Sequence, residues 1–110
     1  MTDISVFDGH NDLLLHLWRD GDRTGQGFFE GRSGHMDLER CRAGGMAGGF
    51  FAIWVPGLAE TDPPEDHPEP VFPPVGPDRA RRITFEMASI LLRMAQGRPD
   101  ALRICRSGVR

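Results

Sequence analysis

An apolar run over residues 48–56, GGFFAIWVP, constrains the fold of this chain more than any other feature. The run ends at Pro56, and it is long enough for a strand but too short for a helix of average length. A strand without polar residues on either face is typical of a parallel sheet that is covered on both sides. The run therefore predicts a buried strand in a parallel α/β sheet.

Shorter patterns on both sides of this run complete an alternation of strands and helices. The expected strands are residues 4–8, 48–56 and 101–105, and the expected helices are residues 11–19, 37–43 and 79–96. The alternation predicts an α/β architecture with parallel strands. Three strands cannot close a barrel, so we expect these residues to be part of a larger domain.

The helix over residues 79–96 has the clearest pattern. We expect Asp78 to cap its first turn and Gly97 to end it. Ser107 is placed to cap a further helix. The apolar positions of the long helix recur at helical spacing on one face: Ile83, Met87, Ile90, Leu91 and Met94.

Two segments have the composition of loops. Residues 20–34 are rich in glycine and polar side chains. Residues 56–77 hold eight of the nine prolines, five acidic residues and no arginine. Proline lacks the backbone donor that helices and sheets require, so we expect a long loop there.

Composition excludes several classes of protein. The net charge of −3 over 110 residues argues against a nucleic-acid-binding protein. No apolar run approaches 18 residues, so we expect no membrane segment, and the N-terminal residues do not resemble a signal peptide. We therefore expect a cytoplasmic location. Cys41 and Cys105 are too far apart for a zinc knuckle, and we expect two reduced, partly buried thiols.

His10 and Asp12 form the one pair that suggests chemistry. They follow the first expected strand, and side chains two residues apart on extended backbone point the same way. Imidazole nitrogen and carboxylate oxygen are both zinc ligands, and the carboxyl ends of parallel strands carry the active sites of barrel enzymes. From spacing alone, the competing interpretation is a histidine and an aspartate that cap the helix starting near Asn11.

The other histidines and Trp54 carry weaker signals. We expect His16 to be a core or boundary residue of the first helix, His35 to lie in a glycine-rich loop, and His67 to be solvated in the proline-rich loop. Trp54, near the end of the apolar run, is either a core residue or a wall of a pocket.

At the level of whole blocks, the chain resembles the membrane (renal) dipeptidase family. VFDGHNDLLLHL, residues 6–17, is similar to the opening signature of that family, and residues 34–56, GHMDLERCRAGGMAGGFFAIWVP, to its second block. The segment 79–108 looks like the next helix, strand and helix start. The resemblance implies that residues 1–110 are the N-terminal part of a single (β/α)₈ TIM-type barrel domain, incomplete within these residues.

The resemblance also implies a site. His10 and Asp12 would be ligands of one zinc in a centre of two, while a bridging glutamate and two histidines would come from later strands. Trp54 falls where relatives place an aromatic residue near the substrate, although it lacks the phenol of the usual tyrosine. None of these residues is assigned a catalytic role other than metal binding. Asp8 has the same parity as the two ligands, which makes it a candidate supporting partner, although a structural role is the simpler interpretation.

The activity implied is hydrolysis of dipeptides by a metal-bound water. The partner would be a dipeptide substrate, with a homodimer of the complete protein left open. The alternative is a catalytically inactive fragment or non-catalytic relative that acts at most as an interaction module. A different metal-dependent amidohydrolase is a third interpretation, but His-x-His is more usual there, so Asp12 argues against it.

Overall fold

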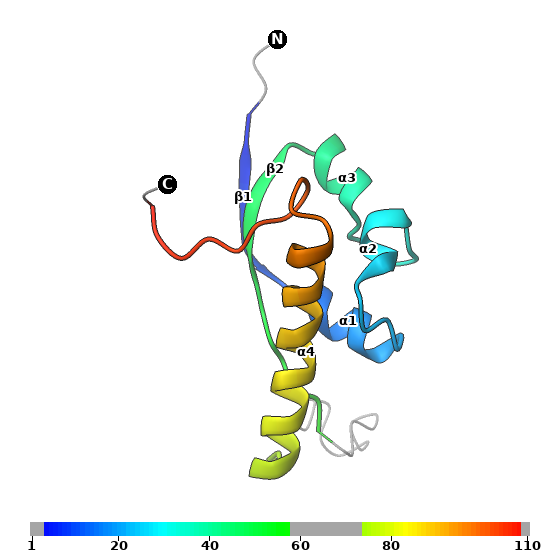
Figure 1. Ribbon diagram of the computed structural model, residues 1–110, viewed down its shortest axis with the longest axis vertical. Helices are drawn as coiled ribbons and strands as arrows, with labels where there is room; N and C mark the ends of the chain where they lie inside the picture. Colours follow the sequence, from blue (N-terminus) through cyan, green and yellow to red (C-terminus); the bar gives the residue numbers. More distant parts are fainter. Residues whose placement is uncertain (1–3, 58–73, 109–110) are drawn as a thin grey trace, which may run out of the picture.

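The computed structural model describes residues 4–57 and 74–108 (Figure 1). Its elements follow the chain in the order β1 (Val6–Asn11), α1 (Leu13–Arg19), α2 (Gln26–Glu30), α3 (Leu38–Ala43), β2 (Met46–Phe51) and α4 (Pro77–Gly97). None of the helices in the described ranges is long and apolar enough to cross a membrane. Most of the predicted proline-rich loop, together with His67, lies outside the described residues.

The two strands form a parallel sheet, as predicted. Val6 pairs with Met46 and Asn11 pairs with Phe51, with shifts of register between these ends. The predicted boundaries of the second strand are wrong, because β2 begins at Met46 and ends at Phe51. A strand pairs only as far as its neighbour extends, and β1 gives way to α1 directly after Asn11.

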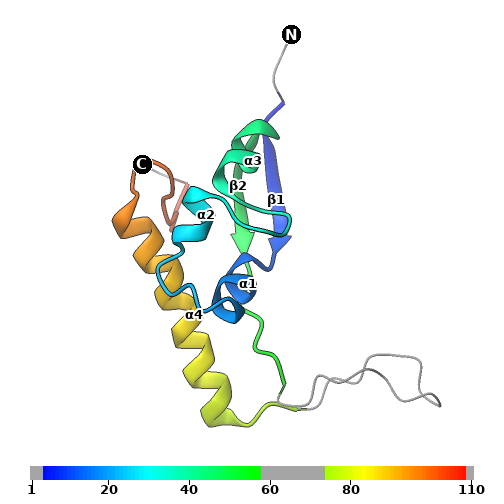
Figure 2. The ribbon, with the colours of Figure 1, turned by 90° about the vertical axis from the view of Figure 1, so that its right-hand side faces the viewer.

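The core lies where α1 packs against α4 (Figure 2). Helical spacing puts the apolar side chains of each helix on one face, so that the two faces can bury one another. The side chains that are at most 2% exposed include Leu13, Leu14, Leu17, Ile83, Met87, Ile90 and Met94. The predicted apolar face of the long helix is therefore confirmed, except that Leu91 is only partly buried.

The start of α4 differs from the prediction. The helix begins at Pro77 with Gly76 as its N-cap, so Asp78 is not the capping residue. Proline fits the first helical position because the N–H that it lacks has no partner in the first turn. Asp78 instead lies within that turn, where a negative charge is favoured by the helix dipole.

Two further predictions of local structure are wrong. The expected loop over 20–34 contains α2, whose first N–H groups, those of Gln26 and Gly27, donate to the carboxylate of Asp22. Residues 101–105 form no strand in the described part of the chain; together with β2 they line an apolar groove of about 390 Å³. The backbone N–H groups of Ala101 and Leu102 both donate to the carbonyl of Arg98, which makes a turn there. Ser107 lies in a bend, and no helix begins in the described residues after it.

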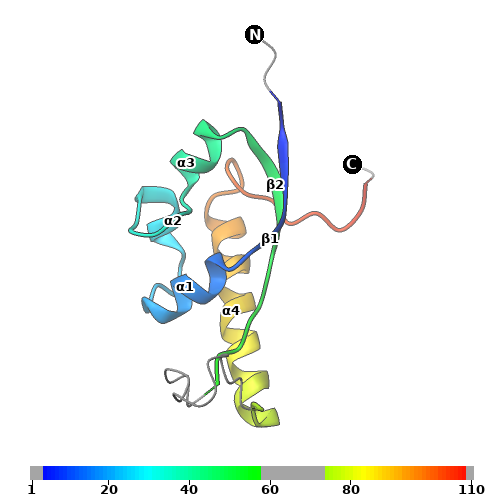
Figure 3. The same ribbon diagram turned by 180° about the vertical axis from the view of Figure 1, so that it is seen from behind.

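One face of the sheet is open, which contradicts the predicted burial of the apolar run on both faces. Figures 1 and 3 show all the helices on the same side of the two strands. Phe7 and Phe50 are 60% and 67% exposed, and their rings meet edge to face with centroids 5.1 Å apart. In the described part of the chain, the helices thus cover one face of the sheet only.

Candidate metal centre

The transition from β1 to α1 brings His10 and Asp12 together. His10 is the penultimate residue of the strand, and Asp12 occupies the N-cap position of the helix. The ring Nε2 of His10 lies 3.2 Å from Oδ1 of Asp12. Both side chains are open to solvent, with 64% and 40% of their surfaces exposed. The predicted convergence at the carboxyl end of the first strand is confirmed, whereas metal binding by the pair stays a prediction.

Asp12 does not act as a helix cap, which removes the competing interpretation of the pair. Its side chain makes no capping hydrogen bond. The backbone N–H of Leu13 donates instead to Oδ1 of Asn11, at 3.2 Å. The preceding asparagine therefore binds the first N–H of the helix, and Oδ1 of Asp12 lies against the His10 ring.

The separation of Nε2 of His10 and Oδ1 of Asp12 is compatible with two ligands of one divalent metal. Zinc binds imidazole nitrogen and carboxylate oxygen at about 2.0–2.2 Å in tetrahedral geometry, which puts two ligand atoms roughly 3.3–3.6 Å apart. The observed 3.2 Å, at which the two groups also contact one another directly as a hydrogen-bonded pair, is close to the lower value. Within residues 4–57 and 74–108, no group of three or more histidine, cysteine, aspartate or glutamate side chains could hold a metal. The pair is therefore half of a candidate site.

Trp54 lies at the same edge of the sheet as the pair. Asn11 pairs with Phe51, and the backbone N–H of Ala52 still donates to the carbonyl of Asn11. Trp54 follows two residues later and is 47% exposed. This exposure excludes a fully buried core role in the described residues, and contact with a substrate stays a prediction.

The remaining predicted residues are not brought to this site as ligands. His16 is exposed, so its expected core or boundary role is wrong, because the leucines on either side of it take the buried face of α1. His35 is exposed in the loop before α3. The two cysteines are free as expected, but only Cys41 is partly buried, and burial raises the pKa of its thiol. Cys105 is exposed, which corrects the prediction for that residue.

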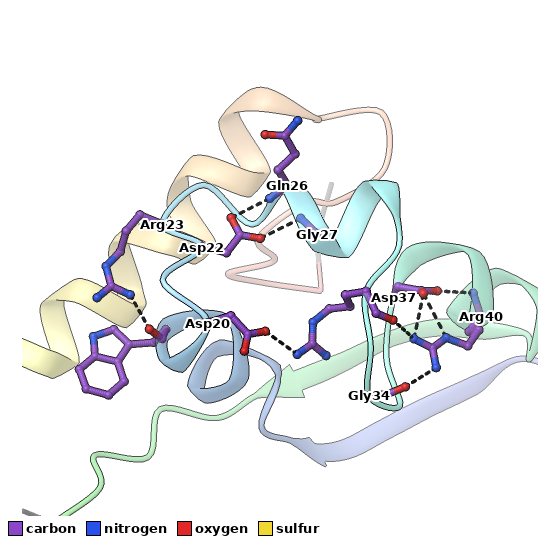
Figure 4. A network of polar contacts seen from close by, with 10 residues as sticks. Asp20, Asp22, Arg23, Gln26, Gly27, Gly34, Asp37 and Arg40 are labelled. Carbon is purple, nitrogen blue, oxygen red and sulfur yellow. Dashed lines mark hydrogen bonds and ion pairs between the residues drawn. The ribbon is translucent and has the colours of Figure 1, made fainter.

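Sequence reasoning missed a polar network that fixes the connection between α1 and α3 (Figure 4). Arg32 forms an ion pair with Asp20 at 3.0 Å. Asp37 accepts the backbone N–H of Arg40 at 2.9 Å and also pairs with its guanidinium group, which in turn donates to the carbonyls of Arg32 and Gly34. These contacts hold the pKa of Asp37 below its usual value, chiefly through the hydrogen bond from the Arg40 side chain. The sequence analysis predicted only a short helix over residues 37–43, and in the structure Asp37 is the N-cap of that helix.

The fold and the pair together define a class: a parallel α/β protein with an exposed histidine–aspartate pair at the carboxyl end of its first strand. The family model of the membrane dipeptidases, peptidase family M19, matches residues 1–108. The chain therefore belongs to the membrane dipeptidase family.

Two solved structures are similar to the chain. A metallopeptidase from Rhodobacter sphaeroides, liganded with a phosphinate mimic of the dipeptide L-Ala-D-Ala, is 36% identical over 96% of this chain, with a TM-score of 0.80. Dipeptidase AC, a metallopeptidase of family M19, is 40% identical over 86% of this chain, with a TM-score of 0.71. An uncharacterised protein encoded in the PQQ-III 3′ region of Acinetobacter calcoaceticus is 33% identical over 94% of this chain.

The chain spans about a third of the length of these relatives. It covers 34% of the Acinetobacter protein, 33% of the Rhodobacter chain and 28% of dipeptidase AC.

Proposed function

We propose that these residues are the first part of a zinc-dependent dipeptidase in which His10 and Asp12 bind one metal of a two-zinc centre. The observation that carries the proposal is the 3.2 Å separation of His10 Nε2 and Asp12 Oδ1 at the carboxyl end of β1. Membership of the M19 family and likeness to two metallopeptidases support it. In this proposal β1 and β2 are the first strands of a (β/α)₈ barrel, and residues 1–110 are the N-terminal part of that single barrel domain.

Each residue of the pair has a defined task in this proposal. Bound zinc supplies a Lewis acid and lowers the pKa of a bound water to near neutrality, which makes a nucleophile for peptide hydrolysis. His10 must present a neutral ring nitrogen, and Asp12 an ionised carboxylate that offsets part of the metal charge. The remaining ligands, which we propose to be a glutamate and two histidines, would come from other strands.

A dipeptide is the proposed substrate. The mimic of L-Ala-D-Ala bound by the Rhodobacter relative supports this choice. Trp54, exposed at the same edge of the sheet, is proposed to contact the substrate through its flat apolar ring, because indole offers only an N–H donor and no phenol. A cytoplasmic location and a homodimer complete the proposal.

The test compares Asp12→Ala with His16→Ala in the complete polypeptide that contains these residues. Loss of the Asp12 carboxylate removes one anionic ligand, so we expect zinc content to fall by one ion per chain. The turnover of L-Ala-D-Ala should also fall. The fall should exceed the roughly 10- to 100-fold loss that is typical when a residue hydrogen-bonded to a metal ligand is removed. His16 is exposed on the neighbouring helix, and its variant should keep the parental zinc content and rate.

Other outcomes separate the alternatives. Full zinc content and full activity in Asp12→Ala would show that Asp12 is not a ligand. A complete polypeptide that binds no zinc and cleaves no dipeptide would instead support the non-catalytic relative. We expect residues 1–110 alone to cleave none, since a catalytic zinc usually needs about three protein ligands.

A further inference from the structure

A short chain of hydrogen bonds lies behind the His10–Asp12 pair. Oδ1 of Asp8 accepts the backbone N–H of His10 at 3.2 Å, and Oδ2 of Asp8 accepts the side-chain amide of Asn11 at 2.9 Å. Oδ1 of Asn11 in turn accepts the backbone N–H of Leu13 at 3.2 Å. Asp8 and Asn11 are half-buried, whereas His10 is largely exposed.

The series of hydrogen bonds from Asp8 to Leu13 can form with only one order of donors and acceptors. The Asp8 carboxylate can only accept, and the Leu13 N–H can only donate. The residue between them must therefore donate at one end and accept at the other, which the amide of Asn11 does. Turning this amide over would break both of its bonds at once.

The bonds also bracket the two candidate ligands. One anchors the backbone of His10 from the strand side, and the last anchors the start of α1 directly after Asp12. Aspartate is itself a good helix cap. The bond to Asn11 uses the first N–H of α1, while the carboxylate of Asp12 makes no capping bond and lies 3.2 Å from the His10 ring.

We infer that Asp8 and Asn11 are positioning residues that hold His10 and Asp12 at the separation a metal requires. The inference rests on the proposed function, since it presupposes that the pair binds zinc. In this inference neither residue would itself be a metal ligand. Their effect passes through the backbone of His10 and through the backbone at the start of α1, next to Asp12.

An exchange of the two side chains tests this inference in the complete polypeptide. Asp8→Asn places an amide opposite the amide of Asn11, and Asn11→Asp places a carboxylate opposite the carboxylate of Asp8. Each single variant should weaken zinc binding about tenfold or more. The double variant Asp8→Asn/Asn11→Asp restores the hydrogen bond between these two side chains, with position 8 now the donor and position 11 the acceptor. Its zinc dissociation constant should lie within about threefold of that of the unmutated protein, because the two changes compensate one another.

The readouts are the zinc dissociation constant, from competition with a chelator, and the melting temperature of the metal-free protein. A purely electrostatic effect would make Asn11→Asp bind zinc more tightly, because it adds a negative charge, and that result would overturn the inference. Lower melting temperatures with unchanged zinc affinity would assign the two residues to folding alone, and would overturn it as well.

Asp12→Ala, measured in parallel, separates this inference from the proposed function. If Asp12→Ala keeps the parental zinc affinity, the proposed function itself fails. If Asp12→Ala loses zinc while the double variant is as weak as the two single variants combined, only the positioning inference is wrong. Loss in Asp12→Ala together with recovery in the double variant supports both.

Discussion

Neighbouring side chains with the same capping ability take different roles at the end of β1. Asparagine and aspartate are equally good caps, yet Asn11 accepts the N–H of Leu13 while Asp12 accepts none at the helix start. Asp8 accepts from the amide of Asn11, which turns the oxygen of that amide toward the N–H of Leu13. The role of Asn11 is therefore set by its partner Asp8 as well as by its own capping ability.

Asp37 gives a pH-dependent prediction at the same scale. Its hydrogen bonds with Arg40 lower the pKa of the carboxyl group in the folded protein. A lowered pKa means that the contribution of Asp37 to stability is complete above the unfolded value, about 3.9, and is lost as pH falls through the folded value. We expect the melting temperature of the unmutated protein to fall towards that of Asp37→Asn as the pH is lowered from about 4 to about 2. Thermal unfolding of both proteins across this range is the measurement, and a constant difference between them would contradict the prediction.

At the scale of elements, the approach of α2 to α4 depends on a glycine. Gly25 is the N-cap of α2, is buried, and has φ of 71°. A Cβ atom added there would clash with Cγ and Sδ of Met94, which is itself only 1% exposed. An alanine at this position would therefore force the buried Met94 side chain to shift within the core.

Gly25→Ala and Gly21→Ala form a matched pair that isolates this contact. Gly21 has a similar φ of 76°, but nothing lies within 4 Å of an added Cβ. Gly21→Ala should cost roughly 1–2 kcal/mol through left-handed backbone strain alone. Gly25→Ala should cost a further 1–3 kcal/mol or so from overpacking. Free energies of unfolding from denaturant titration would show this, and equal losses in the two variants would rule out the close packing.

At the scale of the whole molecule, the apolar face of the sheet is the dominant feature. The helices cover one side, and the two phenylalanine rings on the strands remain more than half exposed. Two-stranded sheets are marginally stable on their own, and unpaired strand edges promote association. A polypeptide limited to residues 1–110 would therefore be stabilised by any contact that covers this face.

Residues 1–110 by themselves should bind a hydrophobic dye, self-associate and unfold over a broad temperature range. Phe50→Ser should reduce both dye binding and association, because it removes the most exposed ring from the face. Phe85→Ser is the matched control, since Phe85 is 68% exposed on α4. Dye fluorescence, sedimentation velocity and calorimetry measure the three properties. A monomer with a sharp unfolding transition and no dye binding would refute the expectation.

The sequence by itself determined the apolar face of the long helix and the two blocks that identify the family. Helical spacing of apolar residues placed Ile83, Met87 and Ile90 on one buried face, and this pattern survives any change in the surroundings of the helix. The family was likewise visible in the two blocks around His10 and residues 34–56, because motif residues keep their order and spacing in the chain.

Only the tertiary structure decided the remaining features. The end of β2 at Phe51 depends on where β1 stops, the exposure of His16 depends on which face of α1 meets α4, and the open sheet depends on what covers it. The contact of Asp12 with His10, and the lack of a capping bond from its side chain, likewise became visible only in the structure. Each of these properties arises from contacts between separate groups in space, and spacing along the chain does not specify such contacts.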